Sequence, residues 1–103
     1  MSIQNIDPGK VQIIQSYLEQ EFHGCRIHNF FDGKGNWQTY LIKFDDVSDS
    51  QLVSVSYDFF RDVPDILATI QVWHLADSIY NANWNSLIVT SKGVEEYANT
   101  LRR

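Results

Sequence analysis

Residues 25–44 read CRIHNFFDGKGNWQTYLIKF, and this stretch decides the fold. Two runs rich in β-branched and aromatic residues, Cys25 to Phe31 and Trp37 to Phe44, flank a turn sequence, Asp32-Gly33-Lys34-Gly35-Asn36. This pattern predicts a β-hairpin in which Phe31 lies opposite Gln38. A third strand is expected from about Gln51 to Tyr57, after a polar turn at 45–50.

This register divides the side chains of the three expected strands between two faces of a sheet. One face is apolar enough to be the core side: Cys25, Ile27, Tyr40, Ile42, Phe44, Val53, Val55 and Tyr57. The other face carries Arg26, His28, Phe30, Trp37, Thr39, Leu41, Lys43, Leu52, Ser54 and Ser56. Its large apolar side chains exceed what a solvated face requires, so we expect a later element or a partner to cover it.

A helix is predicted before the hairpin. Asp7 is a suitable N-cap, and Pro8 suits the first helical position because it needs no N–H partner. An apolar stripe at spacings of three and four follows, and Gly24 is placed to end the helix. The stripe comprises Val11, Ile14, Leu18 and Phe22, widened by Ile13 and Tyr17.

The segment from Asp62 to Ala82 favours one helix, from about Val63 to Tyr80, with Asp62 as its cap and Pro64 in its first turn. Its apolar residues point in two directions, so this helix is expected to be buried on two sides, bent or interrupted. The two sets are Val63, Ile66, Leu67, Ile70 and Trp73, and Val72, Leu75, Ala76, Ile79 and Tyr80. A strand at Thr69–Trp73 is the alternative, because that run is rich in β-branched residues.

The C-terminal part predicts a short strand at Ser86–Thr90 and a last helix capped by Ser91. The charges of that helix suit its dipole, with Glu95 and Glu96 near its start and Arg102 and Arg103 at its end. Its expected stripe is Val94, Tyr97, Ala98 and Leu101. The predicted fold is therefore a single α+β domain over residues 1–103. An antiparallel sheet of about four strands packs against helices in it, in the order α-β-β-β-α-β-α.

Composition narrows the classes of function. The chain has 103 residues with 13 acidic and 8 basic side chains, giving a formal charge of −5. This balance argues against binding to nucleic acids or to anionic membranes, which require clustered Lys and Arg. No apolar run approaches the roughly 18 residues that span a bilayer. No signal peptide is recognisable, and Cys25 is the only cysteine, so we expect a cytoplasmic protein.

The sequence offers little catalytic chemistry. His23, Cys25 and His28 lie within six residues, but Cys25 and His28 project to opposite faces of a strand and a zinc site needs about four converging ligands. Cys25 with a neighbouring histidine lacks a recognisable third orienting group for nucleophilic catalysis. We therefore predict no catalytic residue, no metal site and no cofactor.

The abundance of aromatic residues, 14% of the chain, favours a contact surface. The first hypothesis is a non-enzymatic protein–protein interaction module that forms a homo-oligomer, most simply a dimer, and binds a protein partner through an aromatic and apolar surface. The candidate residues are His28, Phe30, Trp37, Leu41, Trp73, His74, Tyr80 and Trp84.

Two other hypotheses remain open. One is a small-ligand-binding domain or small enzyme with a pocket between the sheet and the long helix. Its candidate lining residues are His28, Trp37, Tyr40, Trp73 and His74. The other is an acidic mimic that blocks a nucleic-acid-binding protein, and it rests on net charge alone.

Overall fold

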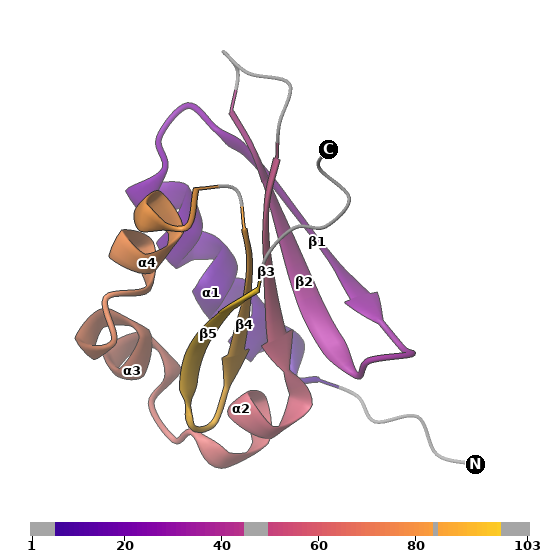
Figure 1. Cartoon of the computed structure of the whole chain (residues 1–103). Coiled ribbons are helices and arrows are strands. Elements are labelled where there is room, and N and C mark those ends of the chain that lie inside the picture. The colour runs from indigo at the N-terminus through magenta and orange to yellow at the C-terminus, as the bar shows by residue number, and fades with distance from the viewer. Residues whose placement is uncertain (1–5, 45–49, 84, 98–103) are drawn as a thin grey trace.

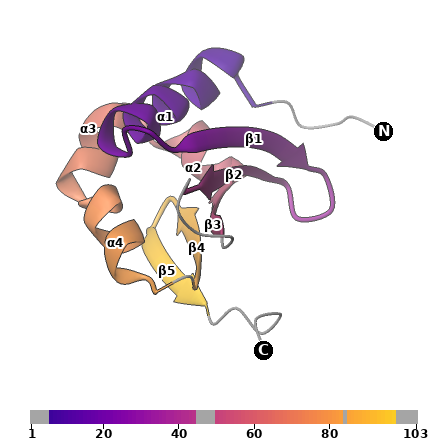
Figure 2. The ribbon, with the colours of Figure 1, turned by 90° about the horizontal axis from the view of Figure 1, so that it is seen from above.

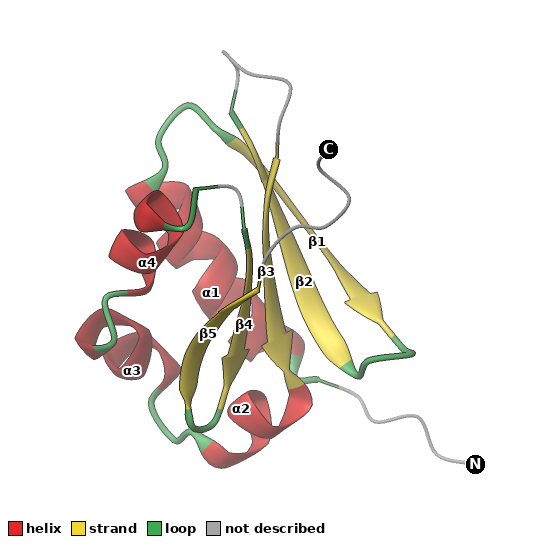
Figure 3. Ribbon diagram, in the orientation of Figure 1, coloured by secondary structure: helices red, strands yellow, loops and turns green. Residues whose placement is uncertain are grey.

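The computed structural model describes residues 6–44, 50–83 and 85–97. Within them the chain forms one α+β domain in which three helices are inserted between the third and fourth strands of a five-stranded mixed sheet (Figures 1 and 3). The helices are α1 (Pro8–Glu21), α2 (Tyr57–Asp62), α3 (Ile66–Val72) and α4 (Leu75–Asn81). The strands are β1 (Arg26–Asp32), β2 (Trp37–Lys43), β3 (Ser50–Ser56), β4 (Ser86–Thr90) and β5 (Gly93–Tyr97).

The hairpin predicted from residues 25–44 is confirmed, including its register. Phe31 lies opposite Gln38, and the antiparallel pairing extends from Arg26 opposite Lys43 to Asp32 opposite Trp37. Strand β3 continues this meander on the other side of β2. The first three strands therefore follow local sequence signals.

The expectation of an antiparallel sheet of about four strands is wrong, because β4 pairs with β3 in parallel. The connection between them contains α2, α3 and α4, which lie beside the sheet (Figure 2). A parallel partner requires such a long crossover, whereas a tight turn can only reverse the chain. The helical segment thus returns the chain to begin β4 at the same end of the sheet at which β3 begins.

The predicted C-terminal helix is also wrong over the described residues. Gly93–Tyr97 forms β5, which pairs antiparallel with β4 across the two-residue turn Ser91-Lys92. Gly93 has a φ of 144°, a conformation that side-chain-bearing residues rarely adopt. Pairing satisfies backbone groups of β4 that an adjacent helix would leave at an unpaired edge. The rest of the predicted helix, including Ala98, Leu101, Arg102 and Arg103, lies outside the described residues.

Helix α1 forms as predicted. The Asp7 carboxylate accepts a hydrogen bond from the Gly9 backbone N–H at 2.9 Å, and Gly24 follows the helix with a φ of +82°. Ile14, Leu18 and Phe22 are buried, so the expected stripe faces the core.

The segment expected as one helix from Val63 to Tyr80 is divided into α3 and α4, and the alternative strand at Thr69–Trp73 is wrong. His74 lies between the two helices with a φ of 56°, in the left-handed region. This residue turns the chain so that Ile70 of α3 and Leu75 of α4 are both buried. Asp65, not Asp62, caps α3, by accepting from the Ala68 N–H at 3.1 Å. Helix α2 was not predicted, and Tyr57 belongs to it rather than to β3.

The core lies between the helices and one face of the sheet (Figure 2). The expected core face is confirmed at its centre, where Tyr40, Ile42, Val53 and Val55 have no exposed surface. At its margin Cys25, Ile27 and Phe44 are partly buried against the core. The Tyr40 hydroxyl donates to the Val11 carbonyl of α1 at 2.9 Å, and burial raises its pKa above the ordinary value of 10.0.

Three amide side chains tie the hairpin to α1. Asn29 donates to the Gln15 side-chain oxygen, and Gln38 donates to the Asn29 side-chain oxygen, both at 2.8 Å. Gln15 also donates to the Ile27 backbone carbonyl at 3.0 Å. Gln15 and Gln38 are each only 7% exposed, so this chain of bonds satisfies polar groups that would be costly to bury alone.

A hydroxyl from α1 takes the place of the missing cap of α4. His74, the N-cap residue of α4, makes no side-chain capping bond. Instead the Tyr17 hydroxyl accepts from the Ala76 backbone N–H at 3.0 Å in a buried setting. Desolvation raises the pKa of Tyr17 above 10.0, so the hydroxyl stays neutral at physiological pH.

We predict that Tyr17→Phe lowers the free energy of unfolding by about 1–3 kcal/mol, because the buried Ala76 N–H loses its acceptor. Urea titration followed by circular dichroism measures this loss. Tyr80→Phe is the matched control, since Tyr80 is 63% exposed and its hydroxyl bonds at 3.3 Å to the Glu21 carbonyl. Equal losses in the two variants would show that the buried cap is not what Tyr17 contributes.

Asp58 of α2 joins the end of β3 to the β4–β5 turn. Its carboxylate accepts from the Ser56 hydroxyl, and from the Ser91 hydroxyl at 2.7 Å. Desolvation is the largest single influence on the pKa of Asp58 and by itself would raise it. The hydrogen bonds from Ser56, from Ser91 and from the Phe59 backbone together outweigh desolvation, so the pKa lies below the ordinary 3.8. Ionised Asp58 therefore favours the folded state.

Since the folded-state pKa of Asp58 is lowered, its contribution is complete above about pH 4 and is lost as the pH falls through the folded-state value. We predict that the free energy of unfolding falls between pH 5 and pH 3, and that Asp58→Asn reduces this fall. Ser91→Ala should also reduce this fall. Urea titrations at pH 5 and pH 3 measure the free energy of unfolding. An equal fall in the wild type and in Asp58→Asn would show that Asp58 is not its cause.

Candidate functional site

The face of the sheet that points away from the helices carries large apolar side chains from every strand. Because Tyr40 and Val53 point into the core, the residues that alternate with them point to the opposite side. We call this surface the open sheet face, and its apolar members are Phe30, Trp37, Leu41, Leu52, Ile88 and Tyr97. Helices α1, α3 and α4 lie on the other side of the sheet (Figure 2).

The strand register brings these side chains into neighbouring rows. Leu41 lies between His28 of β1 and Leu52 of β3. In the next row Thr39 and Ser54 share a hydrogen bond of 3.1 Å, and Ser54 pairs with Ile88. Phe30 and Tyr97, at the two edges, are 50% and 47% exposed, whereas the central members are half-buried. The face is therefore a broad surface that presents aromatic rings at both margins.

Trp37 is held against the hairpin turn by the absence of a side chain at Gly35. A Cβ atom at Gly35 would lie 1.4 Å from the indole nitrogen of Trp37. The turn itself is shaped by Asp32, whose carboxylate accepts from the Lys34 backbone N–H at 3.0 Å, and by Asn36, with a φ of 60°. The glycine-rich turn thus positions a candidate contact residue as well as reversing the chain.

Half of the predicted contact residues gather on one surface. His28, Phe30, Trp37 and Leu41 all lie on the open sheet face. Trp73, His74 and Tyr80 belong to the helical side, and Trp84 lies outside the described residues.

The helical candidates serve mainly in packing and in the helix junction. The Trp73 ring centre lies 5.8 Å from that of Phe59, and Tyr80 lies 4.8 Å from Phe22. His74 is exposed in the left-handed junction, with its Nδ1 atom 3.9 Å from the Asp77 carboxylate. These residues do not form one surface with the hairpin.

Sequence reasoning missed Ile88 and Tyr97 as members of the open sheet face. Ile88 lies in a continuous apolar run with Leu87 and Val89, where alternation is not visible in the residue types. Tyr97 was assigned to a helix. Only the pairing of β4 with β3 and of β5 with β4 places the two on this side.

The five residues expected to line a ligand pocket are distributed over both sides of the sheet. Tyr40 is in the core, whereas His28 and Trp37 are on the open sheet face. Trp73 and His74 adjoin the α3–α4 junction. The expected pocket is therefore not assembled from these side chains.

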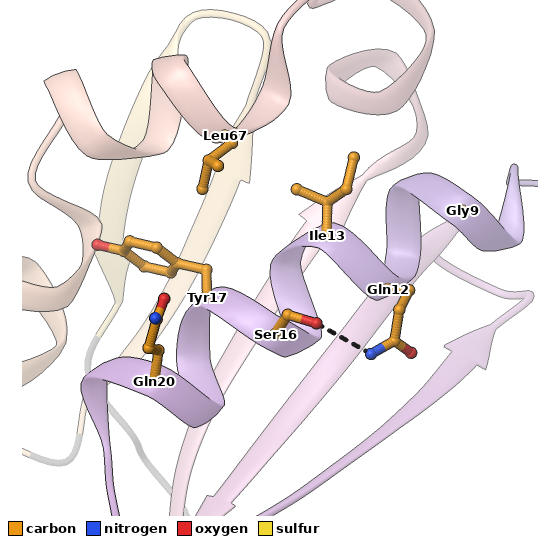
Figure 4. Close-up of a pocket in the computed structure, with 7 residues that line it drawn as sticks. All are labelled: Gly9, Gln12, Ile13, Ser16, Tyr17, Gln20 and Leu67. Carbon is orange, nitrogen blue, oxygen red and sulfur yellow. Dashed lines mark hydrogen bonds between the residues drawn. The ribbon is translucent and has the colours of Figure 1, made fainter.

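Among the described residues, clefts lie between the helices instead. One, of about 260 Å³, separates α1 from α3 and is lined by Ile13, Tyr17 and Leu67 with polar residues of α1 (Figure 4). A second, of about 190 Å³, includes Glu21, His74 and Asp77. In the close-up of the first cleft, Gln12 is bonded to Ser16 within the same helix.

Within residues 6–44, 50–83 and 85–97, no group of three or more His, Cys, Asp or Glu residues is arranged to hold a metal ion. In the same described ranges, no helix is long and apolar enough to cross a membrane.

We predict that Gly35→Ala displaces the Trp37 indole and lowers the free energy of unfolding by about 1 kcal/mol, because the added methyl group occupies its place. The indole N–H signal of Trp37, assigned in NMR spectra with Trp37→Phe, should shift. Gly33→Ala is the matched control, since its Cβ would meet only Phe31, at an ordinary 3.7 Å. An unchanged indole signal in Gly35→Ala would contradict the packing described.

Comparison of this chain with protein-family models, with curated proteins and with solved structures gave no match.

Proposed function

We propose that this protein is a non-enzymatic protein–protein interaction module that binds a protein partner through the open sheet face. The observation that carries the proposal is the set of large apolar side chains on the side of the sheet that α1, α3 and α4 do not cover. Several large apolar side chains gathered on one exposed surface are typical of contact sites.

The composition of the face suits a protein partner. Aromatic residues are enriched at the centres of interfaces, where they supply a large contact area for little loss of conformational freedom. Phe30 and Tyr97 retain about half of their surface, so a partner that covers them gains the free energy of burying aromatic rings. The charged residues Arg26, Lys43 and Asp32 lie at the ends of β1 and β2.

The proposal also includes self-association, because a surface that binds one apolar partner can be covered by another copy of the chain. A homo-oligomer, most simply a dimer, is the expected form.

Site-specific photo-cross-linking tests the surface directly. A benzoylphenylalanine placed at position 30 or at position 52 should yield the same cross-linked product in the cells that make the protein. Val72 is the matched control position, since it is apolar, 71% exposed and on α3, away from the open sheet face. We expect no such product from position 72.

The product then requires a direct measurement. The purified partner identified by mass spectrometry should bind the wild-type protein, and Leu52→Lys should weaken that binding at least tenfold while the circular dichroism spectrum stays unchanged. Products from position 72 with none from positions 30 and 52 would contradict the proposal. So would binding that Leu52→Lys leaves intact.

A further inference from the structure

The two edges of the sheet differ in their protection against pairing with another strand. Strand β5 is five residues long and carries Glu95 and Glu96, one on each face. Short length and charge are the usual means of protecting an edge. Strand β1 has seven residues, and those from Ile27 to Phe31 include no acidic side chain, lysine, arginine or proline.

The outer edge of β1 is accessible. Among the described residues β2 is the one strand that pairs with it, and every residue of β1 except Ile27 is exposed. Helix α1 runs beside β1 in Figure 2 and reaches it through the bond from Gln15 to the Ile27 carbonyl. In an antiparallel ladder, every second residue of an edge strand directs its backbone N–H and C=O groups toward the paired strand. The backbone groups of the residues between them point outward, away from the sheet. Phe30 and Phe31 are also 50% and 39% exposed.

The sequence of β1 is complementary to itself. Arg26 and Asp32 lie at equal distances along the strand from Asn29. When two copies of β1 pair antiparallel about a two-fold axis at Asn29, Arg26 lies opposite Asp32 of the partner subunit, and Asp32 lies opposite the partner's Arg26. Directly opposed residues share a face, so both ion pairs form on the side of the open sheet face.

The side chains between the charges also match. Ile27 lies opposite the partner's Phe31 on the helix side, and His28 lies opposite the partner's Phe30 on the open side. A shift of the register by two residues keeps the faces but removes both ion pairs. The charges therefore select one register.

Existing contacts of these residues are compatible with the pairing. A guanidinium has five donors and a carboxylate about four acceptor positions. The bond from Lys34 to Asp32 and other contacts of Arg26 therefore need not be broken. The Ile27 carbonyl, which accepts from Gln15, has a second lone pair.

We propose that the protein forms a two-fold symmetric dimer by antiparallel pairing of the β1 edges, with Asn29 at the axis and Arg26 opposite Asp32 of the partner subunit. This rests on the proposed function and deepens its self-association by giving it a definite contact: the second copy pairs at the β1 edge and leaves the open sheet face uncovered. The two sheets then join into one, and the open sheet faces become continuous.

A charge-exchange experiment with the full chain tests both the dimer and its register. The wild-type protein, a chain of 12.0 kDa, should sediment as a dimer at micromolar concentration in analytical ultracentrifugation. R26D and D32R each place like charges opposite one another twice, so each should weaken the dimer by roughly 30-fold. An equimolar mixture of the two variants should form a heterodimer, because position 26 of each chain then faces the opposite charge at position 32 of the other.

Matched controls separate pairing from net charge and from folding. K92D changes the net charge by as much as R26D but lies in the β4–β5 turn, and E21R matches D32R from the end of α1. Both should sediment as the wild type does. Recovery of the dimer in the mixture excludes misfolding as the cause of dissociation in either variant.

Three results would overturn the proposal. They are a wild-type protein that stays monomeric at about 100 µM, a dimer that neither charge reversal weakens, and a mixture of the two variants that stays monomeric. Its failure is distinguishable from failure of the proposed function. A monomer that still gives the position 52 cross-link refutes the β1 dimer and the expected self-association, but it leaves the binding of a partner at the open sheet face intact. A dimer without that cross-link refutes only binding of a partner at the open sheet face.

Discussion

The pairing of β1 with β2 is the constraint on which the rest of the structure depends, because it sets which side of the sheet each side chain faces. A shift by one residue would exchange Tyr40 and Leu41 between the core and the surface. The bonds from Asn29 to Gln15 and from Gln38 to Asn29 hold this register and orient the hairpin relative to α1. The core and the candidate contact surface are therefore two consequences of the same register.

The helical side is held together by polar contacts made across long sequence separations. Tyr17 of α1 caps α4 at Ala76, and Lys10 of α1 donates to the Phe60 carbonyl of α2 at 2.8 Å. Asp58 connects α2 to the β4–β5 turn. These bonds let three short helices, each individually unstable in water, pack as one layer on the sheet. The opposite face of the sheet is not covered by α1, α3 or α4.

Local signals were sufficient where one residue type decides the local conformation. Asp7 with Pro8 predicted the start of α1, and the turn around Gly33 and Gly35 predicted the hairpin. They failed where tertiary contacts override propensity. Glu95 and Glu96 favour a helix in isolation, yet they form a strand because their backbone pairs with that of β4. The candidate site was predicted to the same extent. Its residues on β1 and β2 were predicted from the hairpin pattern, whereas Ile88 and Tyr97 were not predicted.

By itself the sequence determined the α+β class, the register of the first hairpin and the two-sided character of its strands, because alternation and turn chemistry act between neighbours in the chain. Only the tertiary structure decided that β4 runs parallel to β3, that His74 divides the helical segment, and that β1 is an outer edge. These features depend on which distant segments meet, and burial and backbone pairing across the whole domain select among the alternatives that local patterns leave open.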